Sequence, residues 1–292
     1  MLKKILFVVL GLLAALILFA CAFYTKAYFS TEARLNTFYQ VVPEQVTVSS
    51  DSSTLAYGAR LTTAKGCKDC HGNDLGGKIF IDDPMLGVIP GPNLTKGEFG
   101  LPADYSTNDW VRALKHGLGR DGKPLVIMPS HEFTQLTQKD MAALISFLQS
   151  MPAVIRSLPA LRLKPLTYVL TELEKIDLIP AEKIDHQRAL VKDIEVGITT
   201  EYGKYLSVAC QGCHRANMKG GDPIAPGFPP VANISLSGNP GKWTEQEFIA
   251  TLRTGITPEG KTLLPEQMPW NMTAAYSDVE LKALYKYLHT LQ

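Results

Sequence analysis

A five-residue pattern that occurs twice constrains this chain more than any other feature: Cys67-Lys68-Asp69-Cys70-His71 and Cys210-Gln211-Gly212-Cys213-His214. The pattern C-x-x-C-H is the attachment sequence for c-type haem. The two thiols of such a motif can form thioethers to the two vinyl groups of one haem, and the histidine can bind the iron. Two copies therefore predict two covalently attached haem c groups.

Other uses of these cysteines fit the pattern less well. A structural zinc site pairs two C-x-x-C units at about 15 to 20 residues, or supplies histidines at H-x-x-x-H spacing. Here the two units lie far apart, and each is followed directly by histidine. A redox-active C-x-x-C would not explain the repeated histidine. The fifth cysteine, Cys21, lies in the N-terminal apolar run, so no thiols remain for a disulfide framework.

The N-terminus carries an apolar stretch from Ile5 to about Phe23, preceded by Lys3 and Lys4. A helix over this stretch would be about 28 Å long, close to the thickness of the hydrocarbon core of a bilayer. The lysines favour a cytoplasmic N-terminus, which puts the rest of the chain on the extracytoplasmic, periplasmic side of the inner membrane. We expect a retained single-pass anchor over residues 1–24. A signal peptide cleaved near Cys21, or a lipid on Cys21, remains the alternative.

The remainder of the chain reads twice through one order of features. Tyr57-Gly58 and Tyr202-Gly203 each open a short helix that leads into a C-x-x-C-H motif. Each repeat then has a helix with an aromatic residue that ends at glycine, a turn, and a closing helix. Capping boxes begin these helices, with a hydroxyl first and a carboxylate three residues later. The four predicted boxes are Ser106/Asp109, Thr137/Asp140, Thr244/Glu247 and Ser277/Glu280.

These features predict a mostly α chain with two tandem haem domains, residues 54–152 and 196–292, preceded by one transmembrane helix. No convincing strand alternation is present. Residues 25–53 are expected to form a stalk. Residues 153–195 form a linker whose apolar first part should pack along the first domain and hold the two domains in a fixed relation.

The sixth iron ligand is predicted from the repeat. Met128 and Met268 each precede the cap of a closing helix by nine residues, and each is followed by proline, which restricts the ligand loop. Met85, Met141, Met218 and Met272 have no counterpart in the other repeat, and Met151 comes too late. We expect the iron ligands to be His71 and Met128 in the first domain, and His214 and Met268 in the second. His131 is the rival ligand.

The remaining histidines and the partners of the ligating ones can also be predicted. A ligating imidazole normally donates its second N–H to a carbonyl. We expect the acceptors to be the carbonyls of Pro92 and of Pro229 or Pro230. His116, near a helix end, is predicted to lie on the surface, and His186 and His289 are predicted to be exposed to solvent.

The order C-x-x-C-H, Gly91-Pro92-Asn93-Leu94, a Trp110-bearing helix, Arg120 to Leu125, Met128-Pro129 and a closing helix resembles a class I cytochrome c domain. Two such domains in tandem resemble the di-haem and tri-haem cytochrome c subunits of bacterial membrane-bound dehydrogenases. The resemblance covers about residues 54–152 and 196–292. The linker string over residues 178–186 is also similar to such chains, although many of those subunits carry three motifs.

This resemblance implies an electron carrier rather than an enzyme. The expected partners are a membrane dehydrogenase or quinol-oxidising complex on one side and an acceptor such as a terminal oxidase on the other. A net charge of +1 offers no case for a nucleic acid partner. The alternative is a di-haem peroxidase or thiosulfate-oxidising cytochrome with one open haem, in which His131 or Glu132 would act as acid or base beside the first haem.

Overall fold

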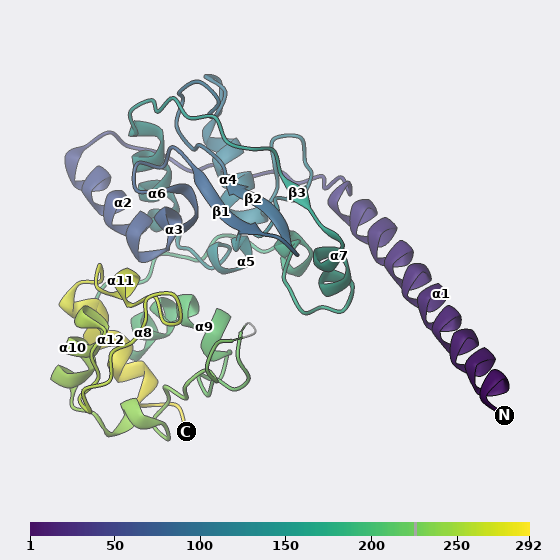
Figure 1. The fold of residues 1–292 in the computed structure, drawn as a ribbon. Coiled ribbons are helices and arrows are strands. Elements are labelled where there is room, and N and C mark those ends of the chain that lie inside the picture. Colours follow the sequence, from purple (N-terminus) through teal and green to yellow (C-terminus); the bar gives the residue numbers. More distant parts are fainter. Residues whose placement is uncertain (225–226) are drawn as a thin grey trace.

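The computed structural model describes residues 1–224 and 227–292, and helices dominate it (Figure 1). The helices of the N-terminal half are α1 (Leu2–Leu35), α2 (Ser52–Ala64), α3 (Cys67–His71), α4 (Thr107–His116), α5 (Ser130–Phe133), α6 (Gln138–Ser150), α7 (Pro165–Glu172) and the 3-10 helix η1 (Pro180–Lys183). Those of the C-terminal half are α8 (Thr200–Leu206), α9 (Val208–His214), the 3-10 helix η2 (Asn239–Lys242), α10 (Glu245–Thr254), α11 (Trp270–Thr273) and α12 (Asp278–Leu288). The mostly helical fold expected from the sequence is confirmed.

A small antiparallel sheet, not expected from the sequence, lies in the first half of the chain. Its strands are β1 (Lys78–Asp83), β2 (Gly87–Gly91) and β3 (Arg162–Leu163), in the order β1-β2-β3. Alternation is hard to recognise because β1 is largely exposed on both faces and a register shift interrupts its pairing with β2. The central strand β2 ends at Gly91, directly before Pro92, so the sheet leads into a loop that touches the first motif.

Helix α1 projects away from the rest of the molecule (Figure 1). It is the one helix of the described residues that is long and apolar enough to cross a membrane. It continues eleven residues past residue 24, into the segment expected to be a stalk. The extension is helical because it packs on α7: Tyr168 donates a 2.8 Å hydrogen bond to Glu32, and Lys26 lies 2.8 Å from Glu172. Arg34 binds Glu182 through two hydrogen bonds of 2.6 and 2.8 Å.

In each repeat the opening helix crosses the closing helix at a glycine. Helix α2 packs on α6, and α8 packs on α12. A Cβ at Gly58 would overlap the carbonyl of Ala143, and a Cβ at Gly203 would overlap the carbonyl of Ala283. The Tyr-Gly pairs of the sequence repeat therefore mark two equivalent helix crossings, each too close for any side chain but hydrogen.

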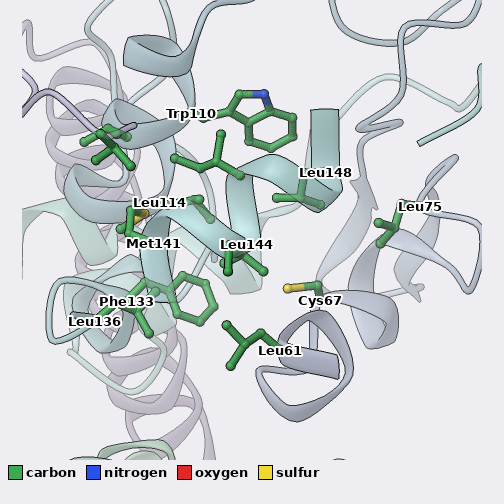
Figure 2. Close-up of a cluster of buried hydrophobic side chains, with 14 residues drawn as sticks. Leu61, Cys67, Leu75, Trp110, Leu114, Phe133, Leu136, Met141, Leu144 and Leu148 are labelled. Atoms are coloured by element: carbon green, nitrogen blue, oxygen red, sulfur yellow. The ribbon is translucent and has the colours of Figure 1, made fainter. Parts of the chain in front are cut away.

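Each half has its own hydrophobic core. The first core surrounds Trp110, Phe133, Met141 and Leu144, which Figure 2 shows together with the thiol of Cys67. The second core contains Phe248, Leu281 and Leu284, together with Tyr202, Tyr205 and Met218. Met141 and Met218 are fully buried core residues. Apolar positions of α6 and α12 supply much of each core, as expected from their helical spacing.

Three of the four predicted capping boxes are complete, at Ser106, Thr244 and Ser277. The prediction for Thr137 was wrong in one respect. Its side chain accepts a hydrogen bond from the N–H of Asp140, but the Asp140 carboxylate does not return to the cap. That carboxylate accepts hydrogen bonds from Tyr57 and Tyr205 instead, at 2.6 and 2.5 Å. Two phenol donors thus replace the backbone N–H that the box would have used.

The two halves meet through contacts that are exchanged between equivalent positions. Tyr205 of α8 donates to Asp140 of the first closing helix. Arg60 of α2, three residues after the Tyr-Gly tyrosine just as Tyr205 is, donates to Glu280 of the second closing helix at 2.5 and 3.0 Å. Reciprocal contacts of this kind define an approximate two-fold relation between the halves. The interface is consequently built from matched surfaces of the two repeats.

Residues 153–195 run along the first half of the chain. Val154 accepts a 2.7 Å hydrogen bond from Asn93, and Arg156 binds Asp74 through two hydrogen bonds of 2.8 and 2.9 Å. Strand β3 extends the sheet, and the carbonyl of Leu178 accepts from the N–H of Ile127. These contacts explain why a segment rich in proline carries so many apolar residues.

Replacing Gly58 with alanine should destabilise the first half, because the new methyl group must separate α2 from α6. We expect a loss of about 1–3 kcal/mol of unfolding free energy, the usual cost of overpacking. Thermal unfolding of the full chain in detergent measures it. Gly197→Ala is the matched control, since its Cβ would lie no closer than 3.7 Å to its nearest neighbour. Equal melting of the two variants would contradict the crossing described here.

Candidate functional site

The first motif occupies a short helix, α3, that directly follows a left-handed Gly66 (φ 70°). His71 is 6% exposed, and its Nδ1 lies 2.8 Å from the carbonyl oxygen of Pro92. This is the acceptor expected from the sequence. A donated Nδ1–H leaves the lone pair on Nε2, the atom that a ligand to iron must use. Burial lowers the pKa of His71, so the imidazole is neutral at physiological pH.

The second motif repeats this arrangement at the end of α9. His214 is also 6% exposed, and its Nδ1 lies 2.8 Å from the carbonyl oxygen of Ala232. The expectation of Pro229 or Pro230 as acceptor was wrong by two residues or more. The pKa of His214 is lowered by burial as well. Both histidines therefore present a neutral ring with the same nitrogen committed to a carbonyl.

An asparagine loop holds each carbonyl in place, and sequence reasoning did not use it. Asn93 follows Pro92, and Asn233 follows Ala232. The side-chain oxygen of each accepts the backbone N–H two residues later at 2.9 Å and the hydroxyl of that residue, Thr95 or Ser235, at 2.8 Å. The shared strings Asn93-Leu94-Thr95 and Asn233-Ile234-Ser235 were the available signal. An alignment of the two repeats on these strings places Ala232 opposite Pro92, and so predicts the Ala232 carbonyl as the acceptor.

None of the four motif cysteines forms a disulfide. Burial raises the pKa of Cys67 and Cys210 to about 12 and that of Cys70 to about 11. The attachment cysteines thus lie in largely apolar surroundings. The thiol of Cys67 points into the first core, toward Leu61 and Leu144 (Figure 2). An apolar setting of this kind suits the vinyl edge of a porphyrin.

The two predicted methionines occupy equivalent places. Met128 packs against the first core and Met268 against the second, each partly buried. In both repeats the proline after the methionine caps a single helical turn, α5 or α11. The structure does not bring His131 into this position: its Nδ1 lies 3.9 Å from Asp177 of the linker.

A cavity of about 420 Å³ lies in the second half, and its walls are mostly apolar. Cys210, Cys213, His214 and Met268 all line it, together with Trp243 and Leu252. The cavity has the volume and lining typical of a site for a large apolar cofactor. The two cysteines, the imidazole and the thioether that the sequence predicts to hold the second haem therefore line one space, and this donor set fits a covalent haem.

Two residues near the first methionine lie differently from expectation. Glu132 was considered as an acid or base beside the first haem, but it reaches the second motif: a Cβ on Gly212 would lie 2.7 Å from its Oε1. His131 turns to Asp177. Helix α5 of the first half contacts helix α9 of the second half. A peroxidase role for either residue at the first haem therefore lacks support from their contacts.

The other histidines are more enclosed than predicted. His116 is fully buried, not on the surface, because linker residues and the segment before α2 cover the end of α4. Its Nδ1 lies 3.0 Å from Nδ1 of His186, which is half-buried, stacks on the His116 ring and has the Tyr39 ring tilted against it. His289 is half-buried, with Nδ1 2.8 Å from the carbonyl oxygen of Tyr285. Burial lowers the pKa of His116 to about 4, so this ring is neutral.

Comparison with known proteins adds the deciding observation. The family model for cytochrome c matches residues 55–152 and 200–292. The chain belongs to the cytochrome c family. Each matched segment contains one C-x-x-C-H motif and one of the two Met-Pro loops, so covalently bound haem c is the cofactor that this family implies.

Three of the relatives that the chain resembles are cytochrome subunits of dehydrogenases. The chain is 24% identical over 269 residues to the fructose dehydrogenase cytochrome subunit of Gluconobacter japonicus, an alignment that covers 85% of this chain and 54% of the relative. It is 25% identical over 280 residues to the alcohol dehydrogenase (quinone) cytochrome c subunit of Komagataeibacter europaeus (84% and 57%). It is 35% identical over 111 residues to the gluconate 2-dehydrogenase cytochrome c subunit of Pantoea cypripedii (34% and 24%). This cytochrome thus spans little more than half the length of the first two relatives.

Replacing His71 or His214 with alanine should prevent stable haem incorporation in the altered domain, because the iron loses its nitrogen ligand. Haem-stained gels normalised to protein should show about half the wild-type signal. His289→Ala is the matched control, since that histidine lies outside both motifs. A fully loaded His214→Ala protein would remove this residue from the site.

Proposed function

We propose that this cytochrome is a membrane-anchored di-haem electron-transfer subunit of a respiratory chain. One observation carries the proposal. Each repeat brings two thiols, an imidazole with Nδ1 hydrogen-bonded to a carbonyl, and a methionine to equivalent places. Haem iron supplies one-electron chemistry, and a His/Met pair leaves no coordination position for a substrate.

In this proposal the haem domains are residues 54–152 and 196–292, and the chain's own residues hold each iron in a fixed environment. Cys67 and Cys70, or Cys210 and Cys213, tether the porphyrin. His71 and His214 supply nitrogen, with the ring orientation set by the carbonyls of Pro92 and Ala232. The apolar walls around the second motif exclude water and favour a raised potential.

A membrane dehydrogenase is the proposed electron donor. The relatives are named as cytochrome subunits of fructose, alcohol and gluconate dehydrogenases. Since oxidation of such substrates releases electrons, their catalytic subunits need a carrier of this class. A quinol-oxidising complex is the other possible donor, and a terminal oxidase is the proposed acceptor. The substrate would be a property of the donor, not of this chain.

Helix α1 is the proposed anchor to the inner membrane, with both haem domains on the periplasmic side. Residues 5–22 of its apolar part are exposed, as expected of a segment that faces lipid. Lys3 and Lys4 precede that part, which favours a cytoplasmic N-terminus. Residues 24–35 pack on α7 and so connect the anchor directly to the first domain.

Replacing Met128 or Met268 with alanine should open one iron of the pair. The potential of that haem should fall and a high-spin absorption band should appear, because thioether sulfur stabilises the reduced, low-spin iron. Optical spectra and redox titration of the purified chain measure both changes. Met85→Ala is the control, since that side chain is 61% exposed. Unchanged spectra in the Met268 variant would exclude it as ligand.

The purified wild type should contain two haems per chain and should turn over peroxide negligibly. Two haems are expected because the chain has two complete sets of predicted ligands. Negligible peroxide turnover is expected because a His/Met pair leaves no iron position open for peroxide. Pyridine haemochrome assay against protein mass measures the ratio, and a peroxidase assay with reduced cytochrome measures turnover. One haem per chain, or rapid peroxide reduction, would contradict the proposed carrier.

A further inference from the structure

A carboxylate of the first domain lies on the haem-attachment turn of the second. Glu132 belongs to α5, and a Cβ on Gly212 would lie only 2.7 Å from its Oε1. Gly212 directly precedes Cys213. Burial raises the pKa of the Cys210 and Cys213 thiols, and the negative charge of Glu132 adds to that rise. The carboxylate is thus within electrostatic reach of both attachment points of the second haem.

The equivalent position of the other repeat holds no charge. Met272 follows Met268 by four residues, as Glu132 follows Met128. Its Cε would lie 3.0 Å from a Cβ on Gly66, the residue before Cys67. The approximate two-fold therefore places one side chain of each domain on the motif of the other. One of these is a thioether and the other is a carboxylate.

Glu132 is half-buried and lies near Lys65, whose pKa is lowered by burial. A cavity of about 10 Å³, enough for about one water, lies between the domains, lined by Glu132, Lys65 and Tyr205. Lys65 caps the end of α2, and its Nζ lies 5.8 Å from the Tyr205 ring centroid. The titratable groups that face Glu132 are Lys65 from α2, Tyr205 from α8, and Cys210 and Cys213 from α9. Burial raises the pKa of Glu132 to about 7, although Lys65 opposes this shift.

We propose that Glu132 sets the reduction potential of the second haem from across the domain interface. A negative charge beside the attachment turn stabilises ferric over ferrous iron, so the ionised carboxylate lowers that potential. Protonation of Glu132 removes the charge, and the potential rises as the pH falls. On the first motif the equivalent side chain, Met272, is uncharged, and the motif's own carboxylate, Asp69, is exposed to solvent. The potential of the first haem should therefore not depend on Glu132. This inference rests on the proposed presence of a haem in the second domain.

Spectroelectrochemical titration of the full chain in detergent tests the proposal, with Glu132→Gln compared to wild type. The variant Met268→His, which changes a proposed ligand of the second haem, shows which redox transition in the titration belongs to that haem. At about pH 8 the variant should show a raised second potential and an unmoved first potential. At about pH 5 the two proteins should agree, because Glu132 is protonated in wild type. Glu132→Asp, which keeps the charge, should keep the pH dependence.

A reciprocal pair of variants supplies an independent measurement. Met272→Glu should lower the potential of the first haem relative to Met272→Gln, since the two differ only in charge at the equivalent position. The proposal is overturned if Glu132→Gln, with both haems loaded, leaves the second potential and its pH dependence unchanged. A haem-to-protein ratio of one in wild type would instead defeat the two-haem proposal, so the two failures are distinguishable.

Discussion

The structure depends on two buried carboxylates, Asp140 and Glu280, that bind donors from both repeats. Each stands at the third position of a closing helix, 6% and 3% exposed. Each accepts a hydrogen bond from the opening tyrosine of its own repeat, Tyr57 or Tyr202. Each also accepts one from the other repeat, through Tyr205 or Arg60. The same groups thus serve the helix start, the helix crossing and the domain interface.

Such groups are costly to bury and so demand complete pairing. Removing one donor would leave a buried carboxylate under-solvated, which costs far more than the net value of the lost bond. Arg60 holds Glu280 with two hydrogen bonds and lowers the pKa of that carboxyl, against the effect of burial. Because both carboxylates have partners in both halves, neither domain can satisfy them alone. The contact between the domains is therefore specific, because only this arrangement pairs both carboxylates with donors.

Local features of the chain were predictable and long-range ones were not. The motifs and the capping boxes depend on residues within one turn of each other, and the repeat identified Met128 and Met268 as equivalents. The helix crossings at Gly58 and Gly203 depend on carbonyls about 80 residues away and were not predicted. The partner of the Asp140 carboxylate could not be read locally, because Tyr205 comes from the other domain. The burial of His116 depends on linker residues 70 positions away. Likewise, β1 was missed because it is largely exposed on both faces.

The continuous helix α1 has a mechanical consequence for how this cytochrome would meet its partners. A flexible tether lets a domain sample a wide volume above the bilayer, with a reach that grows with its length. Here residues 24–35 form about 17 Å of rigid rod, locked to α7 and η1 by Lys26, Glu32 and Arg34. In the proposed orientation the first domain has a nearly constant height and tilt over the lipid. Diffusion then reduces to sliding and rotation in the plane, and a partner with its own redox centre at another height could not exchange electrons with it.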